Sequence, residues 1–144
     1  MRKLLAICAS AMLLSSCVPT SMYYWGKMTD GVSKYEQLTY KHYDQQTPES
    51  ICELLVLYED MVSNPGGSRN TVPPGICAEY GFLMLQPNTA EIFEMYATPK
   101  QKKAFENSEY GALFSEKGIK MLEMEMELYP ESVTFIGPIL KRLK

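Results

Sequence analysis

The side chains able to do nucleophilic, acid–base or metal chemistry are few, and they form no known catalytic pattern. His42 is the only histidine, so neither an HExxH motif nor a pair of histidine ligands is available. The sequence holds no GxSxG or GxxxxGK[ST] motif. The glycine-rich stretch NPGGSRNTVPP (64–74) is interpreted as a connecting loop. We expect no catalytic, metal-binding or cofactor-binding residues, and predict that the protein is not an enzyme.

Two carboxylates and a run of methionines remain as candidates for chemistry. Glu79 and Glu125 fall near apolar helix faces, where a buried acid can be catalytic. A structural hydrogen bond is the preferred interpretation of both. Thioether sulfurs bind Cu(I), but the methionines around EMEME (123–127) spread over more than half of a helix. They are interpreted as core residues.

The N-terminus has the pattern of a bacterial secretory signal. Arg2 and Lys3 precede an apolar run from Leu4 to Leu14, which is too short to span a bilayer as a helix. The run ends in LLSSC, which resembles the lipobox of bacterial lipoproteins. That resemblance implies a signal peptide of residues 1–16 and a lipid on Cys17. Val18 in place of aspartate favours the outer membrane, facing the periplasm, over the inner membrane; an ordinary signal peptide is the alternative.

The charge balance favours lipid over electrostatics as the membrane contact. The formal net charge is −3, and loss of the two N-terminal cations makes the remaining chain more acidic. An acidic chain has no electrostatic reason to bind nucleic acid, and we expect none to be a partner.

Residues 17–31 are predicted to be a lipidated tether that ends in an aromatic anchor segment. Tyr23, Tyr24 and Trp25 are either packed back onto the domain or form a patch that binds a partner or the membrane interface. Both interpretations stay open.

Residues 32–144 are predicted to form a single all-α domain with a C-terminal capping helix. Apolar spacing, N-caps and helix-breaking residues place the helices. The predicted ranges are 32–43, 48–63, 75–86, 89–96, 99 to about 107, about 112 to 129, and 133 onward, with Ser132 as the last cap and Pro138 marking a kink or a late start.

The last two cysteines sit in the first turns of two consecutive helices. Cys52 and Cys77 could form a disulfide in the periplasm. Consecutive helices pack antiparallel, which would place their first turns at opposite ends. We therefore expect two free thiols.

Two glycines point to a close helix crossing. Gly81 lies in AEYGFLML and Gly118 in GIKMLEMEMELYPES, which ends at Pro130. Tetratricopeptide repeats place small residues where two antiparallel helices cross and a proline after the second helix. The chain therefore resembles antiparallel helical hairpins of degenerate tetratricopeptide repeats, with residues 89–111 inserted into one of them.

The chain also resembles a family of small bacterial lipoproteins of unknown function. The stretches that carry the resemblance are YYWGKMTDGVSKY, VPPGICAEYGFLML and ELYPESVTFIGPIL, in that order after the lipobox. Such proteins are typically encoded beside a curli-secretion-channel-like lipoprotein. The resemblance implies an adaptor or scaffold in an envelope assembly or transport complex, whose partner is another envelope protein such as that lipoprotein. A transient pilot for an outer-membrane channel is the alternative, and an enzyme of unrecognised class is a more distant one.

Overall fold

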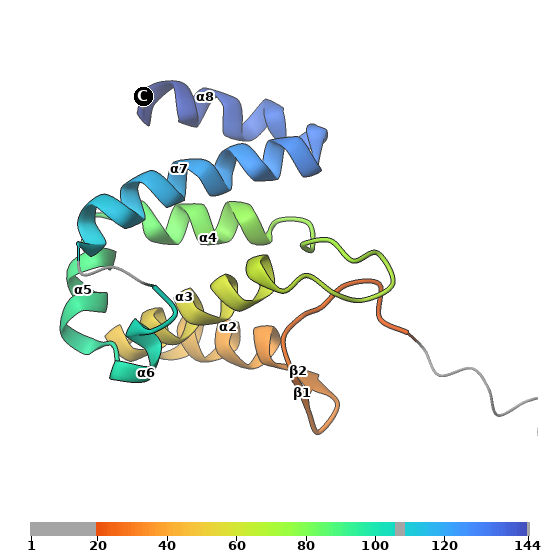
Figure 1. The fold of residues 1–144 in the computed structure, drawn as a ribbon, viewed down its shortest axis with the longest axis horizontal. Helices are drawn as coiled ribbons and strands as arrows, with labels where there is room; N and C mark the ends of the chain where they lie inside the picture. Colours follow the sequence, from red (N-terminus) through yellow and green to blue (C-terminus); the bar gives the residue numbers. More distant parts are fainter. Residues whose placement is uncertain (1–19, 106–108, 144) are drawn as a thin grey trace, which may run out of the picture.

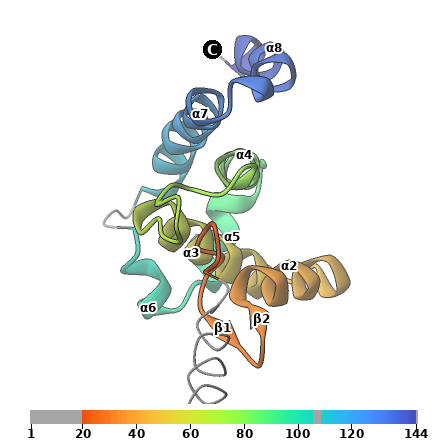
Figure 2. The same ribbon diagram turned by 90° about the vertical axis from the view of Figure 1, so that its right-hand side faces the viewer.

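The computed structural model describes residues 20–105 and 109–143, and the fold is mostly helical, as predicted. The longer helices α2 (Lys34–Gln45), α3 (Pro48–Ser63), α4 (Ile76–Met84), α7 (Tyr110–Leu128) and α8 (Val133–Leu143) lie one upon another in chain order (Figure 1). Each runs antiparallel to the one before it in the stack. Figure 2 shows that they alternate between two sides of the stack.

The predicted helix starts agree with the structure where a local cap defines them. The Thr47 side chain accepts a hydrogen bond from the Ser50 backbone N–H at the start of α3, with a proline at the first helical position. Thr98 and Gln101 form a capping box at the start of α6 (Pro99–Lys102). That helix is much shorter than predicted.

A short β-hairpin replaces the predicted start of the first helix. Strands β1 (Met28–Thr29) and β2 (Val32–Ser33) pair antiparallel. The turn between them is Asp30-Gly31, both with positive φ, which is the pair that two-residue hairpin turns prefer. The helix therefore begins only at Lys34, with Ser33 as its N-cap. This Asp-Gly signal was present in the sequence, and the prediction missed it.

Helices α5 (Thr89–Tyr96) and α6 close one end of the stack (Figure 1). Phe93 is fully buried there and makes edge-to-face contacts with Phe105, Tyr110 and Phe114, with ring centroids 5.0–5.4 Å apart. Within the predicted insertion, 89–111, the side chains of Phe93, Phe105 and Tyr110 thus belong to the main core between α2 and α7.

A second, smaller core lies between α4, α7 and α8. Leu122, Ile136 and Leu140 form its buried centre. Helix α8 is continuous from Val133 through Pro138, so the predicted late start is wrong. The Ser132 hydroxyl is buried and has no hydrogen-bond partner among the described residues. The cap predicted at Ser132 is not formed, because Ser132 is itself the last residue of a 3₁₀ turn, Pro130–Ser132.

Among the residues that the structure describes, no helix is long and apolar enough to cross a membrane.

Candidate functional site

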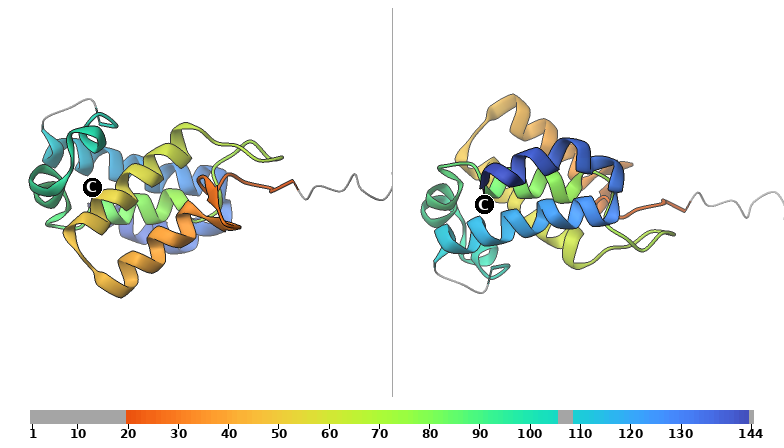
Figure 3. Two further views of the ribbon diagram at one scale, coloured as in Figure 1. Left: turned by 90° about the horizontal axis from the view of Figure 1, so that it is seen from below. Right: turned by 90° about the horizontal axis from the view of Figure 1, so that it is seen from above.

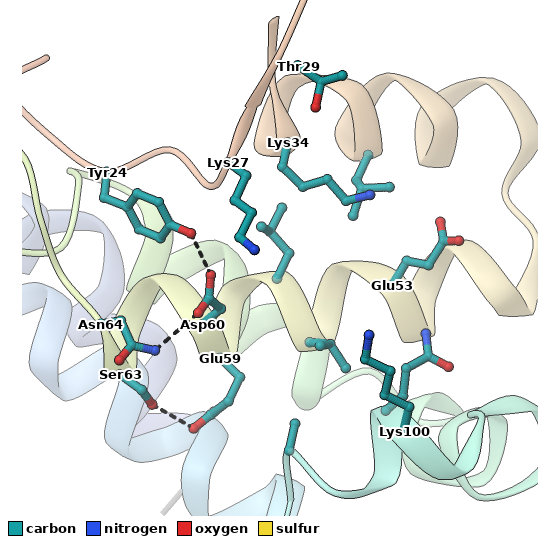
Figure 4. A pocket seen from close by; sticks show the side chains of 15 residues that line it. Tyr24, Lys27, Thr29, Lys34, Glu53, Glu59, Asp60, Ser63, Asn64 and Lys100 are labelled. Atoms are coloured by element: carbon teal, nitrogen blue, oxygen red, sulfur yellow. Dashed lines mark hydrogen bonds between the residues drawn. The ribbon is translucent and has the colours of Figure 1, made fainter.

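A groove of about 770 Å³ lies where the β-hairpin, α2, α3 and α6 meet (Figure 4). Its floor is apolar, because α3 turns one stripe of side chains towards α2 and α6. Leu38 and Leu57 are buried at this floor, and Val56 and Ala104 are half-buried. Val56 and Ala104 therefore offer part of their apolar surface to a ligand, whereas Leu38 and Leu57 are covered by the fold.

Three exposed lysines stand around this floor. Lys27 follows the aromatic segment, Lys34 begins α2, and Lys100 lies in α6 on the opposite wall (Figure 4). No ion pair or hydrogen bond engages any of the three amino groups within residues 20–105 and 109–143. Their charge is thus available to a ligand.

The carboxylates of the groove are already occupied by groups of the protein itself. Glu53 pairs with Lys41 at 2.7 Å, and Glu59 pairs with Lys117. Asp60 accepts hydrogen bonds from the Tyr24 hydroxyl at 2.8 Å and from the Asn64 amide at 3.1 Å (Figure 4). The ion pairs balance the charges of Glu53 and Glu59, and Asp60 keeps its negative charge against those of the three lysines. The excess positive charge suits an anionic group attached to an apolar body.

Tyr24 connects this groove to the aromatic segment. Burial, followed by the hydrogen bond and the charge of Asp60, raises the pKa of Tyr24 to about 12. The phenol therefore stays protonated at neutral pH and acts as a fixed donor to Asp60. It is a structural group in this wall.

The neighbouring aromatic residues also pack onto the domain. Trp25 packs against Tyr35 with ring centroids 5.2 Å apart and the ring planes tilted by 46°, and Arg69 donates to the Tyr23 hydroxyl at 3.2 Å. Tyr23, Tyr24 and Trp25 are each half-buried. The structure thus shows the packed arrangement of these three residues, and a partner that bound them would reach only their outer edges.

The backbone just before the aromatic residues, at Ser21 and Met22, is bound to the loop that follows α3. Ser68 and Arg69 donate backbone hydrogen bonds to the carbonyls of Ser21 and Met22. A Cβ on Gly67 would lie only 2.6 Å from the Met22 backbone, so the chain approaches as closely as glycine permits. From Ser21 onward the predicted tether is therefore part of the fold.

A network of tyrosines and carboxylates links α2, α3 and α4. Glu79 is exposed as a residue, contrary to the expected partial burial, yet its carboxylate accepts from Tyr35 at 2.9 Å and from Tyr58 at 2.8 Å. Glu59 accepts from Tyr80 in the same way. Burial, and then these carboxylates, raise the pKa of Tyr35, Tyr58 and Tyr80. The hydroxyls and carboxylates of this network are thus hydrogen-bonded to one another, and their role is structural.

Glu125 has a structural role at the start of α4. The residue is 3 % exposed. Its two carboxylate oxygens accept from the backbone N–H groups of Gly75 (2.8 Å) and Ala78 (3.3 Å). Gly75 has no side chain to cap this helix, so a residue fifty positions away supplies the acceptor for its free N–H groups.

Gly81 and Gly118 face each other where α4 and α7 cross. A Cβ on Gly81 would lie 2.8 Å from the Gly118 carbonyl oxygen, and one on Gly118 would lie 2.7 Å from Leu85 Cγ. The two backbones are therefore in direct contact at this point, as their sequence positions indicated.

The cysteines take no part in the groove. Cys52 and Cys77 are both buried free thiols, in agreement with the predicted pair of free thiols. Burial raises the pKa of Cys52 to about 11 and that of Cys77 to about 12, so neither thiol ionises readily near pH 7. Cys17 lies outside the described residues. Among the described residues, no cluster of three His, Cys, Asp or Glu side chains could hold a metal ion.

The groove itself was not predicted from the sequence. Its lysines come from three separate elements, and none belongs to a motif. The only local signal is that Lys27 and Lys34 flank the missed Asp-Gly turn, which brings the two residues together.

No family model matches the chain, and comparison with curated proteins and with solved structures gives no match either.

Proposed function

We propose that the protein is a lipid-anchored adaptor of the bacterial envelope that binds an acidic, amphipathic segment of another envelope protein in the groove. The observation that carries this proposal is a set of three lysines above an apolar floor, Lys27, Lys34 and Lys100, which have no partner in residues 20–105 and 109–143. The lipobox supports the anchor, and the family resemblance supports an assembly or transport role beside a curli-secretion-channel-like lipoprotein.

A polypeptide segment fits the groove better than a small molecule does. The lysines that border it are exposed, so a small ligand would keep much of its surface in water, whereas binding pockets usually bury most of a small ligand. An amphipathic segment can lay apolar residues on Val56 and Ala104, the half-buried apolar side chains of the groove, and direct its carboxylates to the lysines. Helices commonly dock into apolar grooves in this way.

The groove is tested with two synthetic peptides of the same amphipathic pattern, one with Glu and one with Lys at the polar positions. The full chain should bind the Glu peptide, and binding should weaken as salt is added. Replacing Lys34→Glu together with Lys100→Glu should weaken it about tenfold or more. Reversing Lys120 on α7 and Lys141 on α8, which are exposed and do not line the groove, should have little effect. Equal binding of both peptides would refute the proposal.

The anchor is tested separately at Cys17. A fatty-acid probe should label the parent protein in cells, and Cys17→Ser should abolish the label and release the protein from the membrane fraction. Unchanged labelling of the Cys17→Ser variant would contradict lipidation at this residue without bearing on the groove.

A further inference from the structure

Helix α8 ends the stack and has apolar side chains on two faces. One face buries Ile136 and Leu140 against α7 and α4. The outward face carries Phe135, which is 76 % exposed, and Ile139, which is 38 % exposed. Figure 3, in the view from above, shows no other described element over this helix.

The outward face is one continuous stripe. Phe135, Pro138 and Arg142 follow one another along α8 at spacings of three and four residues, and Glu131 lies directly before α8, in the 3₁₀ turn Pro130–Ser132; all four are exposed. Residues at these spacings share one side of a helix. Single exposed apolar residues are ordinary, but helical stacks normally end in a cap with a polar outer face. The apolar middle of this stripe therefore calls for a covering surface.

The order of charges along the stripe identifies what fits it. The acid Glu131 lies at one end, the cation Arg142 at the other, and Phe135 and Pro138 lie symmetrically between them. When two such stripes are laid antiparallel, Glu131 of each meets Arg142 of the other, and Phe135 of each meets Pro138. The stripe is thus complementary to itself, as a two-fold symmetric interface requires.

The helix dipole alone explains an acid at the start and a cation at the end of a helix, but it does not explain the apolar residues between them. An anionic membrane would suit Lys141 and Arg142, yet it would repel Glu131 on the same stripe. We propose that α8 is a homodimer interface, in which the outward faces of two copies of this chain pair antiparallel about a two-fold axis.

Charge reversals at the two ends of the stripe give the sharpest test. The full chain is expressed with two different affinity tags, and each tag is used to capture the other. Glu131→Arg alone and Arg142→Glu alone should each reduce self-capture about tenfold, because each places like charges opposite one another. The two single variants should capture each other as well as the parent captures itself, because both charge pairs are then restored.

Failure of the two variants to capture each other, or full self-capture by either one, would overturn antiparallel pairing. The apolar part is tested with Phe135→Asp, which should abolish self-capture. Tyr43→Asp, at a residue of α2 that is 77 % exposed, is the matched control and should leave self-capture unchanged. Phe135 contributes little to the fold, so the melting temperature of its variant should match that of the parent.

A photoreactive phenylalanine analogue at position 135 distinguishes the possible occupants in cells. Irradiation should give an adduct with twice the mass of the chain, containing only this protein. An adduct with another protein or with lipid, or the absence of any adduct, would overturn the homodimer. The groove peptides described above test the proposed function independently of this result.

Discussion

The α4–α7 crossing and the α2–α3–α6 groove are two contacts of the same helical stack, and they differ in how completely they are closed. At the crossing, Gly81 and Gly118 bring two backbones together, and the buried Glu125 satisfies the N–H groups at the start of α4. In the groove, Val56 and Ala104 remain only half-buried and the lysines have no partners among the described residues. The first contact contributes stability, whereas the second retains surface for binding.

The largest effect is expected at the crossing. Gly118→Leu should lower the free energy of unfolding by about 1–3 kcal/mol, because its Cβ would collide with Leu85 and the Gly81 backbone. Thermal denaturation measures the loss. Gly111→Leu on the same helix is the control, since nothing lies within 4 Å of its added Cβ. An equal loss in both variants would show that close helix contact is not the cause.

Removing charge from the cap of α4 should have a somewhat smaller effect. Glu125→Gln retains one acceptor oxygen but presents an amide donor to a buried N–H group, and should cost about 1–2 kcal/mol. Hydrogen exchange at residues 75–79 should become faster, as mass spectrometry can measure. Glu127→Gln, two residues further on and exposed, should change stability by no more than about 0.5 kcal/mol; similar losses for both would contradict the cap.

Alkaline pH should weaken the tyrosine network that joins the two regions. The pKa of Tyr58 and that of Tyr80 are raised by burial and by neighbouring carboxylates, so the folded state retains protons that the unfolded state releases above about pH 10. Stability is thus fully present below that pH and falls above it. Each group contributes up to about 1.4 kcal/mol per pH unit.

Chemical denaturation at several pH values measures this dependence. Between about pH 10 and 11, the free energy of unfolding of Tyr58→Phe should fall less steeply with pH than that of the parent. From about pH 7 to 8, the difference in stability between the variant and the parent should stay constant. If the stability of the variant fell with pH as steeply as that of the parent, the raised pKa of Tyr58 would not be a cause of the alkaline loss of stability.

The smallest effect on stability is expected in the groove. Lys34→Glu together with Lys100→Glu should change the free energy of unfolding by no more than about 0.5 kcal/mol, since both side chains are exposed and unpaired within the described chain. Urea denaturation checks this. A large loss would show that the lysines stabilise the fold and would remove the contrast between the two regions.

Local signals in the sequence predicted much of the secondary structure. Thr47-Pro48 and the Thr98 capping box placed two helix starts, because capping involves residues only two or three positions apart. The start of α2 was misplaced although its signal, Asp30-Gly31, is equally local. The helical periodicity of the last long segment also placed Glu125 on an apolar face, where the structure finds it buried.

The sequence by itself determined the helices, the mildly acidic charge and the glycines that allow a close crossing. Only the tertiary structure decided which groups meet: Glu125 with the start of α4, and Lys27 and Lys34 with Lys100 around one groove. It also decided that the outward face of α8 stays uncovered by the described chain. The physical reason is the distance along the sequence over which each kind of interaction acts. Caps and helix periodicity act within a few residues, whereas these meetings depend on how whole helices pack across fifty or more positions.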